Sequence, residues 1–171
     1  LASVMPPMGY GGFGPSIKGA DPRPVPSRVY FDLTTWHLIN TVYQPQRVAE
    51  LRSMVDFYGE PQHHQRLMKV IQERLGHALV GRAEAAKIAV SQGGDTDIDL
   101  QLIEKGLHSL LQAAQVNKAL GADLGRIVAC AHDTVKMAGV AMSDISALYF
   151  TGGSTGLKLL TDQLEAAFPH A

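Results

Sequence analysis

Two long stretches of the sequence carry apolar residues at helical spacing, and they constrain the fold more than any other feature. The first spans about residues 63–91 and the second about residues 113–138. Apolar side chains three and four residues apart lie on one face of a helix, and that face must pack against another layer. The sequence therefore predicts a largely helical chain, in which Gly93-Gly94 and Gly139 end the two helices.

Shorter elements are expected around these helices. Ile98, Leu100 and Leu102 alternate with polar residues, which is typical of a half-buried strand. A turn at 104–106 would return this strand as a hairpin through 107–111. The remaining expected elements are helices over 34–43, over 46–58 and from the last glycine turn to about 168, and an apolar strand over 147–151.

The opening of the chain has a different texture. Six of the nine prolines lie within the first 26 residues, and glycines are interleaved with them. Proline fixes φ and removes a hydrogen-bond donor, while glycine adds backbone entropy. We therefore expect an irregular surface segment between Met5 and Arg28.

Charge and composition exclude several classes of protein. Fifteen basic residues stand against 16 acidic ones, without the basic excess of a nucleic-acid binder. The single cysteine, Cys130, excludes an intramolecular disulfide framework and a multi-cysteine zinc site. No apolar run approaches the ~20 residues that span a bilayer, and no signal-peptide pattern opens the chain. We expect a cytoplasmic protein without nucleic-acid or membrane partners.

The strand expected over 147–151 runs directly into Gly152-Gly153-Ser154-Thr155 and a helix. Such a junction points free backbone N–H groups at a helix N-terminus, and glycine lets a phosphate or a sugar hydroxyl approach the backbone. The alternative is an ordinary turn in which Ser154 or Thr155 caps the helix. The motif alone leaves both interpretations open.

A second candidate lies on the first long helix. Glu84, Lys87 and Ser91 are three and four residues apart, so their side chains share one face. The alternative is a solvated face with a weak ion pair. No histidine or cysteine shows the spacing of metal ligands, so no metal-binding or catalytic residue is expected.

Taken in order, these segments resemble a known family. Glu84-Ala85-Ala86-Lys87-Ile88-Ala89-Val90-Ser91, then Met142-Ser143-Asp144-Ile145 and Gly152-Gly153-Ser154-Thr155, resemble the second lobe of the nucleotide-binding domain of DnaK-like seventy-kilodalton heat-shock chaperones. The resemblance covers about 65–168, and the glycine-rich opening is similar to short bacterial relatives of the YegD type. It implies an α/β fold of the actin-like ATPase (ribonuclease-H-like) class, here a lobe II fragment with a helical subdomain and a small β-hairpin.

The resemblance also implies roles for single residues. The residues matching Glu84 and Lys87 flank the adenosine, the one matching Ser91 contacts the adenine, and those matching Gly152 and Gly153 approach the ribose and phosphates; Ser154 and Thr155 complete that motif. Two positions depart from the family. Gly156 stands where an arginine stacks on the adenine, and Leu157-Lys158-Leu159 replaces a segment with proline, so Lys158 is a candidate partial substitute.

The resemblance implies three segments: an irregular one over 1–28, a helical subdomain with the hairpin over 29–112, and a lower part over 113–171 with the Gly152-Gly153 turn. The chain starts without methionine and ends just after a helix, which favours a fragment. The implied function is half of the ATP-binding site of a DnaK-like chaperone. We expect the parent protein to be an ATPase and this chain alone to be inactive.

The implied cofactor is ATP or ADP, with Mg²⁺ held in the parent by residues absent here. The implied partners are the first lobe, client proteins and nucleotide-exchange or co-chaperone factors. Two alternatives remain open: a non-enzymatic α-helical interaction module, and another actin-like protein such as a sugar kinase or a filament protein.

Overall fold

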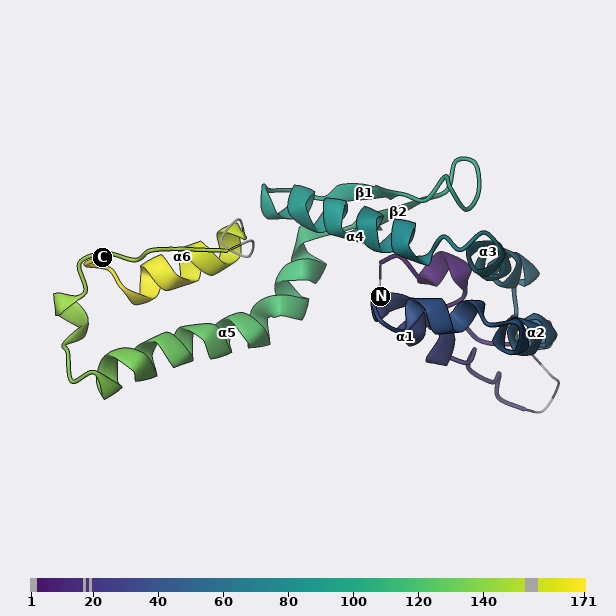
Figure 1. The fold of residues 1–171 in the computed structure, drawn as a ribbon, viewed down its shortest axis with the longest axis horizontal. Coiled ribbons are helices and arrows are strands. Elements are labelled where there is room, and N and C mark those ends of the chain that lie inside the picture. Colours follow the sequence, from purple (N-terminus) through teal and green to yellow (C-terminus); the bar gives the residue numbers. More distant parts are fainter. Residues whose placement is uncertain (1–2, 17, 19, 153–156) are drawn as a thin grey trace. The chain divides into compact units, whose positions relative to one another are not determined.

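Helices make up most of the structure, a computed structural model that describes residues 3–16, 18, 20–152 and 157–171. The fold is mixed α/β, mostly helical, with a two-stranded antiparallel sheet among these residues (Figure 1). The chain divides into two compact units. The first unit is Leu1–Ala85 with Asp97–Leu110, and the second unit is Ala86–Thr96 with Leu111–Ala171.

The elements follow one another in a simple order. The helices are α1 (Arg28–Thr34), α2 (Pro45–Ser53), α3 (Pro61–Gln72), α4 (Gly76–Ser91), α5 (Ala113–Met137) and α6 (Lys158–Ala167). The strands are β1 (Thr96–Asp99) and β2 (His108–Leu111). Short 3₁₀ helices cover Pro6–Met8, Ile39–Tyr43, Val55–Phe57 and Met142–Asp144. The expected helices over 46–58, over 113–138 and at the end of the chain are thus largely confirmed.

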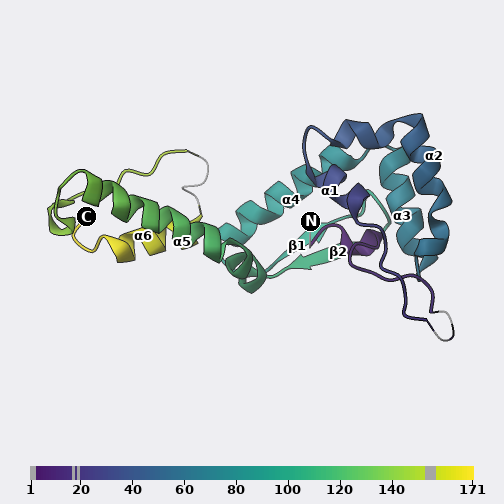
Figure 2. The ribbon, with the colours of Figure 1, turned by 90° about the horizontal axis from the view of Figure 1, so that it is seen from below.

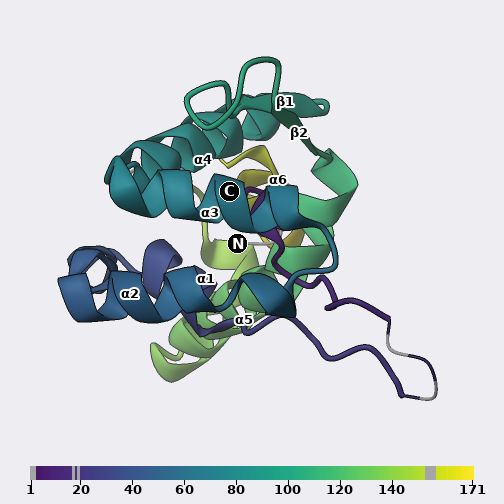
Figure 3. The ribbon, with the colours of Figure 1, turned by 90° about the vertical axis from the view of Figure 1, so that its right-hand side faces the viewer.

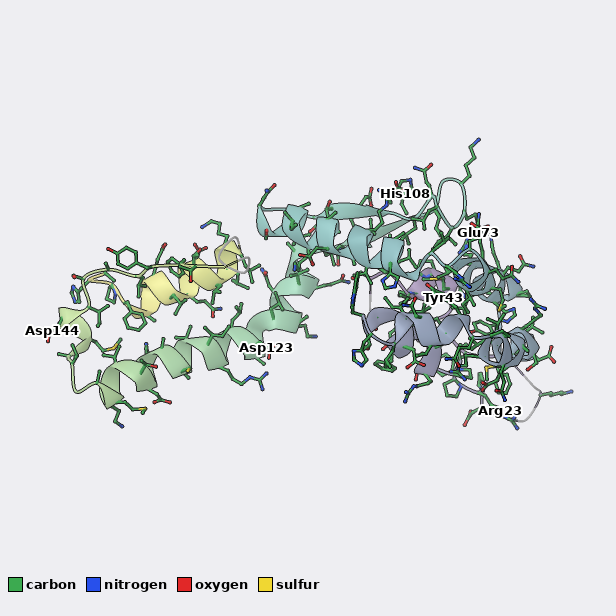
Figure 4. All side chains as sticks on the ribbon, viewed as in Figure 1. Arg23, Tyr43, Glu73, His108, Asp123 and Asp144 are labelled. Atoms are coloured by element: carbon green, nitrogen blue, oxygen red, sulfur yellow. The ribbon has the colours of Figure 1, made fainter. Side chains whose placement is uncertain are left out.

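The core of the first unit lies among α1, α2, α3 and the opening segment. Figure 3 shows α2 and α3 running side by side, and Figure 4 labels Tyr43, whose hydroxyl accepts a hydrogen bond from the amide of Gly76 at the start of α4. Tyr30 and Leu33 from α1 and Leu67 from α3 are fully buried. Met5 and Met8 from the opening segment are buried against them, so this segment belongs to the core.

The opening segment is irregular, as expected, but ordered by backbone hydrogen bonds. The amide of Gly14 donates to the carbonyl of Arg23 at 2.7 Å, and the amide of Val25 donates to Gly12 at 2.9 Å. These bonds close a long loop. The amide of Gly59 donates to the carbonyl of Phe13 at 2.9 Å. This bond attaches the loop to the short connection between the 3₁₀ helix over Val55–Phe57 and α3.

The single long helix expected over 63–91 is wrong, because the structure has two helices, α3 and α4, separated at 73–75. Arg74 has φ +54°, a left-handed conformation that no α-helix continues through. The amide of Gly76 donates to the hydroxyl of Tyr43 at 2.9 Å. A Cβ at Gly76 would lie 2.5 Å from that oxygen, so the break depends on a tertiary contact that only glycine permits.

The helix expected over 34–43 is also wrong. Helix α1 ends at Thr34, and only a 3₁₀ helix over Ile39–Tyr43 follows. The hydroxyl of Thr34 donates to the carbonyl of Tyr30 at 3.0 Å, and that of Thr35 donates to Phe31 at 2.8 Å. The two threonines therefore bond backward to carbonyls of the helix that ends here, rather than capping a helix that begins.

The hairpin expected over 98–111 is confirmed as β1 and β2. Ile98, Leu100 and Ile103 are buried, as the alternating pattern predicts for the first two. Arg82 of α4 forms an ion pair of 3.5 Å with Asp99, and the hydroxyl of Ser109 donates to the carbonyl of Ser3. Both contacts lie inside the first unit and hold the hairpin against it.

The second unit consists mainly of α5 and α6, which run side by side in Figures 1 and 2. The rings of His132 and Phe168 meet edge to face, with centroids 5.4 Å apart. The strand expected over 147–151 is wrong: these residues form no helix or strand and pair with no strand in the described parts of the chain. A strand needs a neighbour for its N–H and C=O groups, and Tyr149 in this stretch is 91% exposed.

Candidate functional site

A pocket of about 240 Å³ lies inside the second unit, where three helix ends meet. The end of α4 contributes Val90 and Ser91, the first turns of α5 contribute Val116 and Asn117, and the first turns of α6 contribute Lys158 and Asp162. Its described lining is completed by Gly93, Gly94, Ala113, Leu157 and Leu159. The apolar walls carry a few polar groups, which is the usual composition of a site for a small molecule.

The turn after α4 shapes one wall of the pocket. Gly93 and Gly94 have φ values of +118° and +85°, which residues with a Cβ rarely adopt. The amide of Gly93 donates to the carbonyl of Val90 at 3.0 Å and ends the helix. The carboxylate of Asp95 then accepts a hydrogen bond of 2.9 Å from the amide of Ala113, so one residue after the turn caps α5.

Ser91 has a defined hydrogen-bonding role in this wall. Its hydroxyl donates to the carbonyl of Ile88 at 2.6 Å, one turn earlier in α4. A serine hydroxyl has a single hydrogen, so the lone pairs of Oγ remain for another group. Ser91 can therefore accept a hydrogen bond from a ligand that carries an N–H or O–H group.

Lys158 and Asp162 supply the charged groups of the pocket. The ammonium nitrogen of Lys158 lies 2.6 Å from the Oδ1 atom of Asp162, one turn along α6. The hydrogen bond to this carboxylate raises the pKa of Lys158 above its usual value, so the ammonium stays protonated at neutral pH. The charges of the pair cancel, which leaves the pocket polar but without net charge from these two groups.

The site residues predicted from the sequence fall into three groups. Ser91 lines the pocket. Glu84 and Lys87 lie on α4, with exposed side chains, and are not among its described lining residues. Gly152 has φ +93° in the segment before α6 and also stands outside the lining, whereas Gly153, Ser154 and Thr155 lie outside the described residues.

Sequence reasoning missed four residues that contribute to the pocket. Gly93 and Gly94 were interpreted only as the end of a helix, and Asn117 and Asp162 carried no motif. The pattern that could have identified Asp162 is its spacing of four residues from Lys158, which places both side chains on one face of α6. Nothing in the sequence around Asn117 indicates that it lines the same pocket as Ser91.

Other candidate groups in the described residues offer fewer polar side chains for binding or catalysis than this pocket does. No cluster of three or more potential metal ligands occurs among them, and Cys130 is an exposed free thiol. The Nε2 atom of His64 lies 2.9 Å from the carbonyl of Leu51, so this buried histidine serves the core. A second pocket of about 240 Å³, in the first unit, is lined by the opening loop and by Asp56 and Phe57.

No helix in the described parts of the chain combines the length and apolar character needed to cross a bilayer.

Comparison with known proteins shows similarity to two chaperones. The chain is 25% identical over 95 residues to a chaperone protein HscA homolog from Shewanella frigidimarina, which covers 56% of this chain and 15% of the relative. It is 28% identical over 102 residues to the homolog from Shewanella oneidensis, which covers 59% of this chain and 16% of the relative. No family model matches the sequence, and no solved structure is significantly similar.

These similarities support a relationship to the seventy-kilodalton heat-shock chaperones. The matched region spans about one sixth of the length of these relatives. The similarity therefore concerns a part of such a chaperone, and the mixed, mostly helical fold is compatible with a fragment of one of its domains.

Proposed function

We propose that this chain is the second-lobe part of the nucleotide-binding domain of a DnaK-like chaperone of the YegD type, and that the pocket of the second unit holds the nucleoside of ATP or ADP. One observation carries the proposal. Ser91 and the Leu157-Lys158-Leu159 segment, far apart in the sequence, line the same pocket. The first is the position at which the family contacts adenine, and the second begins one residue after Gly152-Gly153-Ser154-Thr155.

The donors and acceptors of the pocket suit a nucleoside. The Oγ atom of Ser91 can accept a hydrogen bond, the amide of Asn117 can donate and accept, and the ammonium of Lys158 can donate. The apolar walls from Val90, Val116 and Leu159 suit the faces of a purine base. In this proposal Glu84 and Lys87, on the preceding turns of α4, flank the adenosine, as the resemblance implies.

The proposal places this chain in a larger ATPase of actin-like fold. Residues 29–112 would form the helical upper part of the lobe and residues 113–171 its lower part, with 1–28 as an irregular leading segment. A first lobe would supply the phosphate loop, the catalytic groups and the Mg²⁺ site. This chain alone would then bind nucleotide only weakly and would not hydrolyse it. The parent would be a cytoplasmic protein whose partners are clients and nucleotide-exchange or co-chaperone factors.

The test is a titration of the ¹⁵N-labelled chain with ADP to millimolar concentration, followed by amide chemical shifts. We expect the largest shifts at Ser91, Gly93, Asn117 and the first turn of α6. The Asn117→Trp variant places an indole over the pocket and should abolish these shifts. The Lys118→Trp variant is the matched control, because Lys118 is exposed on α5 and does not line the pocket.

The outcome separates specific from unspecific binding. Loss of the shifts in Asn117→Trp together with their retention in Lys118→Trp supports the proposal. An absence of shifts at millimolar ADP, or shifts of equal size in both variants, contradicts it.

A second candidate function, a helical protein-interaction module, is favoured by one observation in the first unit. Trp36 is 66% exposed, and Phe13 and Phe31 are also largely exposed. Large aromatic side chains on a surface are typical of protein-binding sites. The ADP titration separates the two functions, because a pure interaction module would give no response at the pocket of the second unit.

A further inference from the structure

Lys158 occupies an unusual position for a lysine. It is the first residue of α6, and its ammonium is bonded to Asp162 four residues later. Side chains of both residues line the pocket that also contains Ser91. The pair therefore belongs both to the surface of α6 and to the wall of the pocket.

The stability of α6 does not account for this pair. The N-terminus of a helix carries partial positive charge, so a cation in the first position is unfavourable. An ion pair four residues apart also stabilises a helix less when the lysine precedes the acid. In addition, 71% of the Lys158 side chain and 49% of the Asp162 side chain are exposed, where ion pairs contribute little.

The chemistry of the pair suits a ligand. An ammonium group has three N–H donors, and Asp162 accepts one of them, which leaves two for another molecule. The carboxylate restricts the flexible lysine side chain to one region of the wall. It also cancels the positive charge, so the pair favours a neutral hydrogen-bonding group over a polyanion.

We propose that Lys158, positioned by Asp162, is the cationic residue that contacts the nucleoside part of the nucleotide in this pocket. The assignment rests on the proposed function. Lys158 would take the place of the arginine that the family has at the position of Gly156. Its ammonium would donate hydrogen bonds to the base or the ribose. Asp162 acts through Lys158 and is a positioning residue.

The test compares two probes, adenosine and Mg²⁺-free ADP, by the same NMR titration of the 171-residue chain. Lys158→Ala should weaken binding of both probes by a similar factor, about tenfold, which is typical for loss of a charged hydrogen bond. Lys158→Arg keeps a cationic donor and should restore most of the affinity. Asp162→Asn should weaken both probes by a smaller factor, because Lys158 remains but is no longer held.

Lys136→Ala is the matched control, since Lys136 is exposed near the other end of α5 and does not line the pocket. All three positions, Lys158, Asp162 and Lys136, are exposed, so the variants should keep the wild-type spectrum outside the pocket. If Lys158→Ala changes the spectrum throughout the second unit, Lys158→Met replaces it, because methionine removes the ammonium and keeps most of the length of the side chain.

The outcomes separate this inference from the proposed function. A loss of ADP affinity with unchanged adenosine affinity would make Lys158 a phosphate contact and overturn the assignment. Unchanged affinities in Lys158→Ala, or tighter ADP binding in Asp162→Asn, would overturn it while leaving the nucleotide site standing. If the wild-type chain bound neither probe, the proposed function would fail, and this assignment with it.

Discussion

The guanidinium of Arg66 meets the carboxylate of Glu104 through two parallel hydrogen bonds, of 2.7 Å from Nε and 3.0 Å from Nη2. Arg66 lies on α3, and Glu104 lies in the loop between β1 and β2. The Nη1 atom of Arg66 also donates to the carbonyl of Pro7 at 3.2 Å. Only 15% of the Arg66 side chain is exposed, so one residue joins three distant segments of the first unit.

This pair predicts a pH dependence of stability. The hydrogen bond from Arg66 holds the pKa of Glu104 below its usual value. The unfolded state then binds more protons than the folded state, so stability increases with pH. The contribution is fully present above the unfolded pKa of about 4.3 and is lost as the pH falls through the lowered folded pKa. We expect Glu104→Gln to unfold at a lower temperature at pH 7 and to approach the wild type near pH 3.

The measurement is thermal unfolding between pH 7 and pH 3, followed by the fluorescence of Trp36. This is the single tryptophan, and its ring lies 4.6 Å from that of His77 in the first unit. Glu73→Gln serves as the control, because Glu73 is an exposed glutamate at the end of α3. A constant difference between Glu104→Gln and the wild type across this range would refute the linkage.

Gly9 and Gly11 provide a matched pair for the opening segment. Gly9 has φ +101°, and a Cβ there would lie 2.6 Å from the ring of Tyr58. Gly11 has φ +75° but faces open space. We expect Gly11→Ala to cost about 1–2 kcal/mol for the left-handed conformation. Gly9→Ala should cost about 1–3 kcal/mol more, because the methyl group overlaps a buried ring. Urea unfolding measures the free energy of unfolding of both variants. Equal losses would show that the Tyr58 ring moves aside without an energetic cost.

Tyr30 connects the opening segment to α1 through its hydroxyl. The hydroxyl donates to the carbonyl of Met8 at 2.8 Å and lies 2.9 Å from the hydroxyl of Tyr58. Burial raises the pKa of Tyr30, so the group stays neutral. Tyr30→Phe would leave two buried polar groups unpaired and should cost about 1–3 kcal/mol. Tyr58→Phe removes one bond while Tyr30 keeps Met8, so we expect about 0.5–1.5 kcal/mol. The same urea titration tests this order, and a larger loss in Tyr58→Phe would reverse the assignment.

The parts of the fold that could be predicted from the sequence depend on local periodicity. Helix α5 matches its expected range because its pattern extends over enough residues to fix one face. The hairpin forms as expected, but β1 lies earlier, at Thr96–Asp99, and Leu100 and Leu102 belong to the loop. The break before α4 and the end of α1 could not be predicted in this way. They depend on the contact between Gly76 and Tyr43 and on the backward bonds of Thr34 and Thr35, which only the folded chain brings together.

The candidate site was predicted only in part, for a similar reason. Ser91 belonged to a helical motif, so its face could be deduced from spacing. Asn117 and Asp162 contribute because the first turns of α5 and α6 converge on the end of α4. Convergence of this kind is set by packing over long sequence separations, and no local pattern records it.

The hydrogen bond from Ser91 to Ile88 leads to a prediction about base selectivity. Because the single hydroxyl hydrogen is used at 2.6 Å, Ser91 can only accept a hydrogen bond from a ligand. The exocyclic amine of adenine donates, whereas hypoxanthine carries a carbonyl oxygen at that position and cannot. We expect adenosine to bind about tenfold more tightly than inosine, consistent with one unmatched polar contact.

Ser91→Ala should remove most of this preference, mainly by weakening the binding of adenosine. Ser143→Ala, a change at an exposed serine of the second unit, should keep the preference. Parallel NMR titrations with the two nucleosides give the ratio for each variant. A preference that survives in Ser91→Ala would assign base selection to another group in the pocket.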